Sequence, residues 1–146
     1  MKTQGEKNEQ TSIGRVEAVL LPNGRLVVAK VDTGAYSSSV HCDHMEEREE
    51  NGATALYFSL NHGGQWLKAE QYEKIAVRVA NGHQTERYAV PLTINIGAAA
   101  FTTLFTLNPR YDMKCEMLLG RRFLQENNLL VDVMQDYLLC RQRKER

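Results

Sequence analysis

The sequence predicts an all-β fold in a single domain, and three observations support this. Short runs of β-forming residues recur along the 146 residues, with turn-forming residues between them. The pairs Asn23-Gly24 and Asn81-Gly82 each stand between two apolar runs, which is a strong signal for a β-hairpin. Only residues 121–128 have a convincing helical pattern. Many short strands at regular spacing are typical of a β-barrel or a β-sandwich.

The expected elements follow in chain order. A flexible, polar lead is expected over residues 1–12, the folded domain over residues 13–140 and a solvated basic tail over residues 141–146. The expected strands of the four hairpins are residues 16–21, 26–31, 55–60, 65–69, 75–80, 84–90, 92–96 and 101–107. Pro91 is expected at an edge or a bend, because proline cannot donate to a strand ladder.

Two stretches are expected outside these hairpins. Residues 41–52 are polar, and their charged run at 45–50 is expected to form a solvated helical turn or a loop. After the helix, which presents Phe123 and Leu124 inward, closing strands are expected over residues 129–133 and 137–140.

An aspartate ends one of the expected strands, in the segment Val31-Asp32-Thr33-Gly34-Ala35. A carboxylate placed at the end of a buried strand, on a tight Thr-Gly turn, is presented bare to a substrate. An ordinary turn has the same residues, because Asp and Thr bond to local backbone and Gly tolerates positive φ. A distant segment, Met117 to Arg121, supplies two apolar residues and a glycine that can thread beneath the Asp loop before a helix begins. The two segments together favour a catalytic loop.

These segments resemble the Asp-Thr-Gly loop and the hydrophobic-hydrophobic-Gly element of retropepsin-like aspartic peptidases. Further segments match, in consistent order, a bacterial retropepsin-like family formerly labelled ATP-dependent zinc proteases. The matching segments are residues 29–41, 77–83, 86–90, 108–113, 117–121 and 130–133. The resemblance covers residues 13–139 and implies a closed retropepsin-like barrel with one short C-terminal helix.

The resemblance also implies roles for individual residues. Asp32 would be the catalytic carboxylate, Thr33 would hydrogen-bond between subunits, and Gly34 would let the substrate backbone approach. Aspartic peptidases use two carboxylates that share one proton across an attacking water. This chain has a single Asp-Thr-Gly, so the mechanism requires a homodimer with one Asp32 from each subunit. The loop would be supported by Ala35, Leu118, Leu119, Gly120 and Arg121.

Substrate contacts are expected from Tyr36, Ser37 and a hairpin that closes over the substrate as a flap. The hairpin at Asn81-Gly82 is favoured, because residues 84–96 can continue as the long strand that follows a retropepsin flap. The turn at 62–64 is the alternative. Tyr36 and Ser37 replace the acidic residues of viral retropepsins, one of which pairs with the Gly-Arg arginine, so the partner of Arg121 stays open. The bacterial family often has Arg at position 36, and its absence weakens any inference about acidic substrates.

Composition excludes several other classes of protein. With 18 basic and 18 acidic residues the chain has no net charge, so neither nucleic acid nor an anionic membrane is an expected partner. Three cysteines without paired spacing suit a reducing compartment. No secretory signal or transmembrane segment is visible, so a cytoplasmic protein is expected. No phosphate loop and no His-Glu-x-x-His motif occurs, and neither a cofactor nor a metal is expected.

The preferred interpretation is therefore a homodimeric retropepsin-like aspartic endopeptidase that acts on a peptide or protein. Family members are associated with ATP-grasp ligases that add glutamate tails to a ribosomal protein, which implies a functional link to such a ligase and the trimming of glutamate-tailed proteins. Two alternatives stay open. One is a non-catalytic binding or regulatory module of the same fold. The other is a zinc-dependent protease, using the cluster His41, Cys42, Asp43 and His44.

Overall fold

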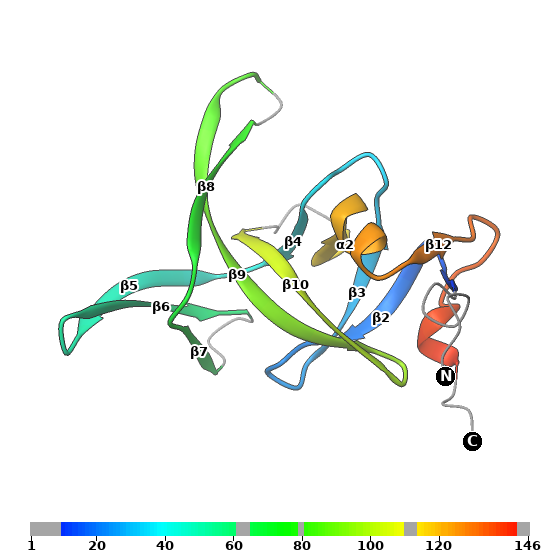
Figure 1. Cartoon of the computed structure of the whole chain (residues 1–146), viewed down its shortest axis with the longest axis horizontal. Coiled ribbons are helices and arrows are strands. Elements are labelled where there is room, and N and C mark those ends of the chain that lie inside the picture. Colours follow the sequence, from blue (N-terminus) through cyan, green and yellow to red (C-terminus); the bar gives the residue numbers. More distant parts are fainter. Residues whose placement is uncertain (1–9, 61–64, 79–80, 110–113, 143–146) are drawn as a thin grey trace, which may run out of the picture.

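The structure is a computed structural model that describes residues 10–60, 65–78, 81–109 and 114–142 (Figure 1). Strands dominate it. They are β1 (Thr11–Ile13), β2 (Val16–Leu20), β3 (Leu26–Val31), β4 (Ser38–His41), β5 (His44–Glu50), β6 (Ala53–Ser59), β7 (Trp66–Ala69), β8 (Glu73–Arg78), β9 (Gln84–Ile96), β10 (Ala99–Asn108), β11 (Met117–Leu119) and β12 (Leu129–Val131). The helices are α2 (Arg121–Glu126) and the 3-10 turn η1 (Leu139–Arg141). The expected all-β fold with one short α-helix is confirmed.

The main sheet closes on itself as a ring of strands. Its order is β10-β4-β11-β3-β2-β9, and β10 pairs again with β9. β8 extends the sheet from the outer part of β9. β11 lies between β3, to which it is parallel, and β4, to which it is antiparallel. The segment Met117–Leu119 therefore passes beside the strand that leads directly into Asp32, as the sequence predicts.

Two smaller sheets flank this ring. The antiparallel sheet β5-β6-β7 projects away from it, and β1 pairs with β12 in a parallel two-stranded sheet near the chain ends (Figure 1). The lead expected over residues 1–12 is thus too long, because Thr11 and Ser12 pair with Leu129 and Leu130. Residues 1–9 lie outside the described residues.

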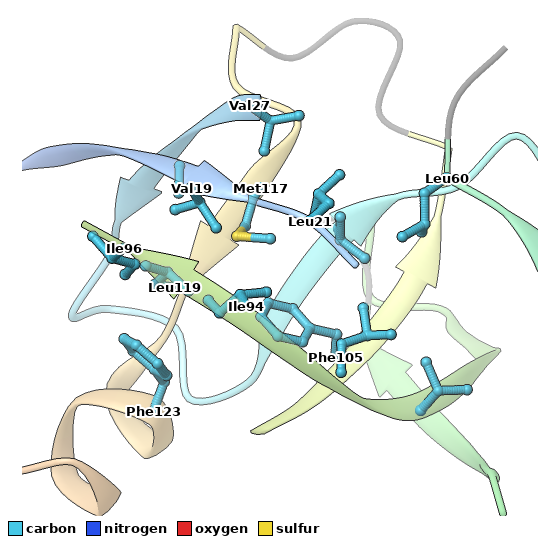
Figure 2. Packing of buried hydrophobic residues seen from close by; sticks show 14 of the residues in the cluster. Val19, Leu21, Val27, Leu60, Ile94, Ile96, Phe105, Met117, Leu119 and Phe123 are labelled. Carbon is cyan, nitrogen blue, oxygen red and sulfur yellow. The ribbon is translucent and has the colours of Figure 1, made fainter. Parts of the chain in front are cut away.

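The core fills the space between the strands of the ring. Ile94, Phe105, Met117 and Leu119 are fully buried and point toward one another from β9, β10 and β11 (Figure 2). α2 covers one side of this core through Phe123, whose ring packs edge-on against Phe101 with 5.3 Å between ring centroids. Burial of each large apolar side chain contributes about 1.5–3 kcal/mol. The inward placement of Phe123 and Leu124 is confirmed.

The charged run at 45–50 is a strand, which corrects the expectation of a helical turn or loop. β5 pairs with β6 along its whole length, from His44 opposite Ser59 to Glu50 opposite Ala53. Its side chains are mostly exposed, so the apolar alternation that marks a half-buried strand is missing from the sequence. Charged residues on such an outer strand also protect it from pairing with other chains.

Pro91 lies inside β9 rather than at a break between two strands. β9 pairs with β8 only up to Ala89 and with β2 only at Asn95. At Pro91 the strand therefore has β10 as its neighbour on one side, where Leu104 is opposite. The missing N–H is tolerated because this part of a long strand is a local edge.

The last closing strand, expected over residues 137–140, is absent. The described chain there forms η1 instead, and β12 ends at Val131 rather than at residue 133. The cause is Glu17 of β2, whose fully buried carboxylate accepts the backbone N–H groups of Leu138, Leu139 and Cys140. These groups are satisfied by one side chain, so they do not form a ladder with a neighbouring strand.

Candidate active site

Asp32 follows β3 directly and begins the loop that leads to β4. Its backbone N–H donates to the carbonyl oxygen of Leu119 in β11 at 2.9 Å. Its Oδ1 accepts the N–H of Gly34 at 2.9 Å, and its carbonyl oxygen accepts the N–H of Ala35 at 3.2 Å. The loop is thus a tight turn anchored to β11. It fixes the half-buried carboxylate through one oxygen.

Gly120 supports this loop by close approach. A Cβ atom on Gly120 would lie 2.7 Å from the carbonyl oxygens of both Tyr36 and Ser37. Its N–H donates to the Ser38 Oγ at 3.0 Å. Gly120 has a φ of −95°, an ordinary value, so space rather than backbone strain requires glycine here. Any larger residue would push the Asp loop outward.

The start of α2 binds the same loop. The N–H of Arg121 donates to the Ala35 carbonyl oxygen at 2.7 Å, and the N–H of Arg122 donates to that of Tyr36 at 3.0 Å. The first N–H groups of a helix have no partner within it, so they are free to make such contacts. Arg121 Nη1 also donates to the Thr33 carbonyl oxygen at 2.9 Å, and its guanidinium carbon lies 5.7 Å from the centre of the Tyr36 ring. These contacts answer the open question about the partner of Arg121.

Asp32 faces a cleft of about 1010 Å³. The cleft lies between β2, β3 and the segment after β12. Its lining is Arg15, Val16, Lys30, Val31, Asp32, Thr33, Lys114, Cys115, Leu118, Val131, Val133 and Asp136. Arg15 pairs with Asp136 at 2.8 Å, and the hydrogen bond and charge of that guanidinium hold the pKa of Asp136 below its usual value. Lys30 and Lys114 add positive charge to the walls around Asp32.

A second pocket, of about 520 Å³, lies between the Asp loop and the β8–β9 hairpin. Its lining is Ala35, Tyr36, Ser37, Ser39, Ile75, Ala76, Arg87, Thr106, Asn108 and Leu118. Leu118 lines both pockets. Among the described residues, the β6–β7 hairpin contributes none to either pocket. The site thus brings together Asp32, Tyr36, Ser37 and the β8–β9 hairpin.

The turn of that hairpin has the expected chemistry. Asn81 Oδ1 accepts the N–H of His83 at 3.0 Å, and Gly82 has a φ of 89°, in the left-handed region that glycine enters freely. The pairing of β8 and β9 extends to Arg78 opposite Gln84. The competing turn at residues 62–64 lies outside the described residues.

Two glutamates with several hydrogen-bond partners were not predicted from the sequence. Glu17 also accepts the N–H of Gly14 at 2.7 Å, so its carboxylate joins β2 to both ends of the domain. Glu47 of β5 accepts hydrogen bonds from the hydroxyls of Tyr72 and Tyr88 at 2.5 and 3.1 Å and lies 3.3 Å from Lys74. The Tyr72 bond is the main cause of the lowered pKa of Glu47. For Glu17 a signal existed, since strand alternation puts it on the inward face with Val19.

The cluster at residues 41–44 is divided between the interior and the surface. The Nε2 of buried His41 lies 2.6 Å from Asp43 Oδ1, and Cys42 is a buried thiol whose pKa burial raises to about 11. His44 is exposed and stacks against Trp66. Across the described part of the chain, no three His, Cys, Asp or Glu side chains are grouped to hold a metal ion. Within the same residues, no helix has the length and apolar character needed to cross a membrane.

Comparison with known proteins gives three findings. Residues 12–142 match the family described as RimB-like, retropepsin-like aspartic endopeptidase RimB. Two curated proteins named probable alpha-L-glutamate ligase are similar, one from Shewanella pealeana (29% identical over 119 residues) and one from Shewanella halifaxensis (30% over 122 residues). The matches cover 77% and 80% of this chain and 26% of each relative. The chain therefore spans about a quarter of the length of these relatives.

Among solved structures, a Legionella pneumophila protein of unknown function superposes with a TM-score of 0.74 at 27% identity. The superposition covers 88% of this chain and 98% of that protein. The ring of strands is therefore an arrangement already known from a crystal structure.

Proposed function

Because the chain belongs to the RimB-like family of retropepsin-like aspartic endopeptidases, we propose that it hydrolyses peptide bonds with a water activated by two Asp32 carboxylates. One observation carries this proposal. Asp32 sits at the end of β3 on a loop held by β11 and α2, and its carboxylate faces a cleft of about 1010 Å³. We place the peptidase domain over residues 13–140 with β1 joined to it, and treat residues 141–146 as a basic tail.

The proposed chemistry needs a proton shared between two carboxylates. Two like charges so close cannot both ionise, so one group keeps a proton while the other is a base. The ionised carboxylate accepts a proton from the attacking water. The protonated one donates to the oxygen of the scissile carbonyl. The pair then exchanges roles. The carboxyl that took the proton of the water gives it to the amide nitrogen, the C–N bond breaks and the amine leaves, while the other carboxylate takes back the proton that it gave to the carbonyl oxygen.

A second copy of the chain supplies the other carboxylate in this proposal. The face beside the Asp32 cleft supports such an arrangement, because it exposes apolar side chains that a partner would cover. Val133 is 67% exposed and Met134 is 84% exposed. Thr33 is also exposed, so its hydroxyl is available for the proposed hydrogen bond across the two-fold axis.

The flap in this proposal is the β8–β9 hairpin with its turn at Asn81-Gly82. A shared pocket supports this assignment. It is lined by Ile75, Ala76 and Arg87 of the hairpin and by the residues directly after the Asp-Thr-Gly. Tyr36 and Ser37 of the same pocket are proposed to contact substrate.

The proposed substrate class and partner rest on the relatives. Both curated relatives are named as glutamate ligases and are much longer than this chain. A peptidase domain related to part of such proteins fits a role in trimming or processing glutamate-tailed proteins, in functional connection with an ATP-grasp ligase. We place this activity in the cytoplasm, where the free thiols of Cys42, Cys115 and Cys140 stay reduced.

The ligase names also favour a second candidate function. A domain that accounts for about a quarter of such a protein can serve as a non-catalytic binding or regulatory module that presents substrates to the ligase. This module would use the same pockets without hydrolysis. It predicts peptide binding that survives substitution of Asp32, with no cleavage by the wild type.

Peptide cleavage followed by mass spectrometry tests the proposal. Wild type and Asp32→Asn are incubated with glutamate-tailed peptides and a mixed peptide library at several pH values. Glu70→Gln is the control, since Glu70 is a well-exposed side chain outside both pockets. We expect cleavage by the wild type and the control and none by Asp32→Asn. Light scattering on all three proteins shows that the loss does not come from dissociation of a dimer.

The other outcomes separate the alternatives. Equal cleavage by wild type and Asp32→Asn overturns the aspartic mechanism, and sensitivity of that cleavage to a chelator would then support a zinc protease. Binding without cleavage by either protein favours the regulatory module.

A further inference from the structure

The pocket between the Asp loop and the β8–β9 hairpin has one charged side chain in a mostly polar wall. Hydroxyls from Tyr36, Ser37 and Thr106 and the amide of Asn108 line it. Arg87 of β9 carries the only formal charge among its ten lining residues at neutral pH. A binding site for a neutral apolar group does not need a guanidinium, which is costly to remove from water without a partner.

Arg87 is half-buried, and within the described residues the structure gives its side chain no hydrogen bond, ion pair or ring contact. Its position on the strand explains this. Arg87 is opposite Ile75 and shares that residue's face of the hairpin, whereas its neighbours Glu86 and Tyr88 point to the other face. The contacts of Tyr88 with Glu47 are made on that other face.

The strand register puts one acid of the hairpin, Glu73, on the same face as Arg87, two residues before Ile75 in β8. Glu73 is exposed, and among the described residues no hydrogen bond or ion pair joins it to Arg87. The guanidinium of Arg87 is therefore held beside the pocket with its donors available to a ligand.

We propose that this pocket is a subsite for an acidic side chain of the peptide substrate, whose carboxylate binds to Arg87. This inference rests on the proposed peptidase function. A guanidinium presents two parallel N–H donors that match the two oxygens of a carboxylate. The hydroxyl of Ser37, which also lines the pocket, is a further donor.

The pocket is adjacent to the cleft that contains Asp32, because Leu118 lines both. In an extended peptide, side chains on the same side recur every second residue, about 6.6 to 6.8 Å apart. With the scissile bond at Asp32, we assign the acidic side chain to the next residue on the same side, two residues from that bond. A two-fold dimer has two such pockets, so the preference applies on both sides of that bond.

The test compares matched peptides that differ only by Glu or Gln at this position. The ratio of kcat/KM for the two peptides is measured with wild type, Arg87→Gln and Arg87→Glu. Lys68→Gln is the control, because it also removes one positive charge but lies on β7 outside both pockets. The wild type and the control should prefer the Glu peptide by roughly 10- to 100-fold, as expected for a hydrogen-bonded charge pair. Arg87→Gln should reduce the ratio to about 1, and Arg87→Glu should favour a Lys peptide.

A ratio that Arg87→Gln leaves unchanged overturns the subsite, even though the peptidase function stands. A misfolded fraction of a variant lowers cleavage of both peptides by the same factor, so the ratio still reports the specificity of the folded protein. If the wild type cleaves neither peptide, the proposed function fails. The affinities of the two peptides then test the subsite separately. Fluorescence anisotropy with the Asp32→Asn protein should show roughly tenfold tighter binding of the Glu peptide. Equal affinities would contradict the assignment.

Discussion

Replacing Glu17 with Gln changes one fully buried side chain that holds the chain ends in place. The Glu17 carboxylate accepts four backbone N–H groups, from Gly14, Leu138, Leu139 and Cys140, at 2.7 to 3.1 Å. Glutamine has nearly the same shape, so the substitution leaves little empty volume. Its effect therefore reports the hydrogen bonds and the charge.

The expected loss of stability is about 4 kcal/mol. A hydrogen bond to a charged group contributes about 1.5–3 kcal/mol, and one between neutral groups about 0.5–1.5 kcal/mol. Each of the four bonds thus loses roughly 1 kcal/mol when the acceptor becomes neutral. One oxygen is also replaced by an NH₂ group, which faces backbone donors instead of accepting from them. For a chain of this size, such a change lowers Tm by roughly 8 to 16 °C.

Guanidinium denaturation of wild type and Glu17→Gln, at one protein concentration, measures this loss. We expect a lower midpoint with an unchanged slope, which identifies a change in stability rather than in unfolded-state compactness. Glu70→Gln, at a well-exposed carboxylate, should stay within about 0.5 kcal/mol of wild type. A loss below about 1 kcal/mol for Glu17→Gln would refute the view that these bonds hold the C-terminal segment.

Three further predictions concern the surroundings of single residues. Gly120→Ala should destabilise the fold by about 1–3 kcal/mol and reduce cleavage, because a Cβ would meet the Tyr36 and Ser37 carbonyl oxygens at 2.7 Å; an unchanged Tm would contradict this. Burial raises the pKa of Cys42 to about 11, which keeps the thiol protonated at pH 8, so iodoacetamide should label it only after unfolding. Mass spectrometry checks this, and rapid labelling of Cys42 in the folded protein would be inconsistent with it. Met134→Lys, which puts a charge on an 84% exposed apolar side chain, should dissociate the proposed dimer in sedimentation experiments; a dimer of unchanged strength would place the interface elsewhere.

Much of the fold could be predicted because its signals are local. Asn-Gly turns specify hairpins through the φ values that they require, and apolar runs specify strands. The helix α2 follows Gly120, as expected, and buries Phe123 and Leu124. β5 was missed because both of its faces are largely solvated, so its sequence lacks the alternation that marks a strand.

The candidate site could be predicted only in part. The Asp32 loop and the segment Met117–Leu119 were recognised as partners from their residue types, and the structure places them in contact. Arg121 was recognised too, but its partners are the Thr33 carbonyl oxygen and the Tyr36 ring. Every residue has a backbone carbonyl oxygen, so no residue type could have indicated the contact between Arg121 and the Thr33 carbonyl oxygen.

The sequence by itself determined the all-β class, the hairpin turns, the helix and the loop that carries Asp32, because each depends on residues close together in the chain. Tertiary structure alone decided the surroundings of Glu17 and Arg87. The C-terminal partners of Glu17 lie more than 120 residues away, and Arg87 lines a pocket with the Asp loop only because the fold places β8 and β9 beside that loop. Whether a charged side chain binds its own backbone or faces an open pocket depends on which strands become neighbours, and that is settled by packing across the whole domain.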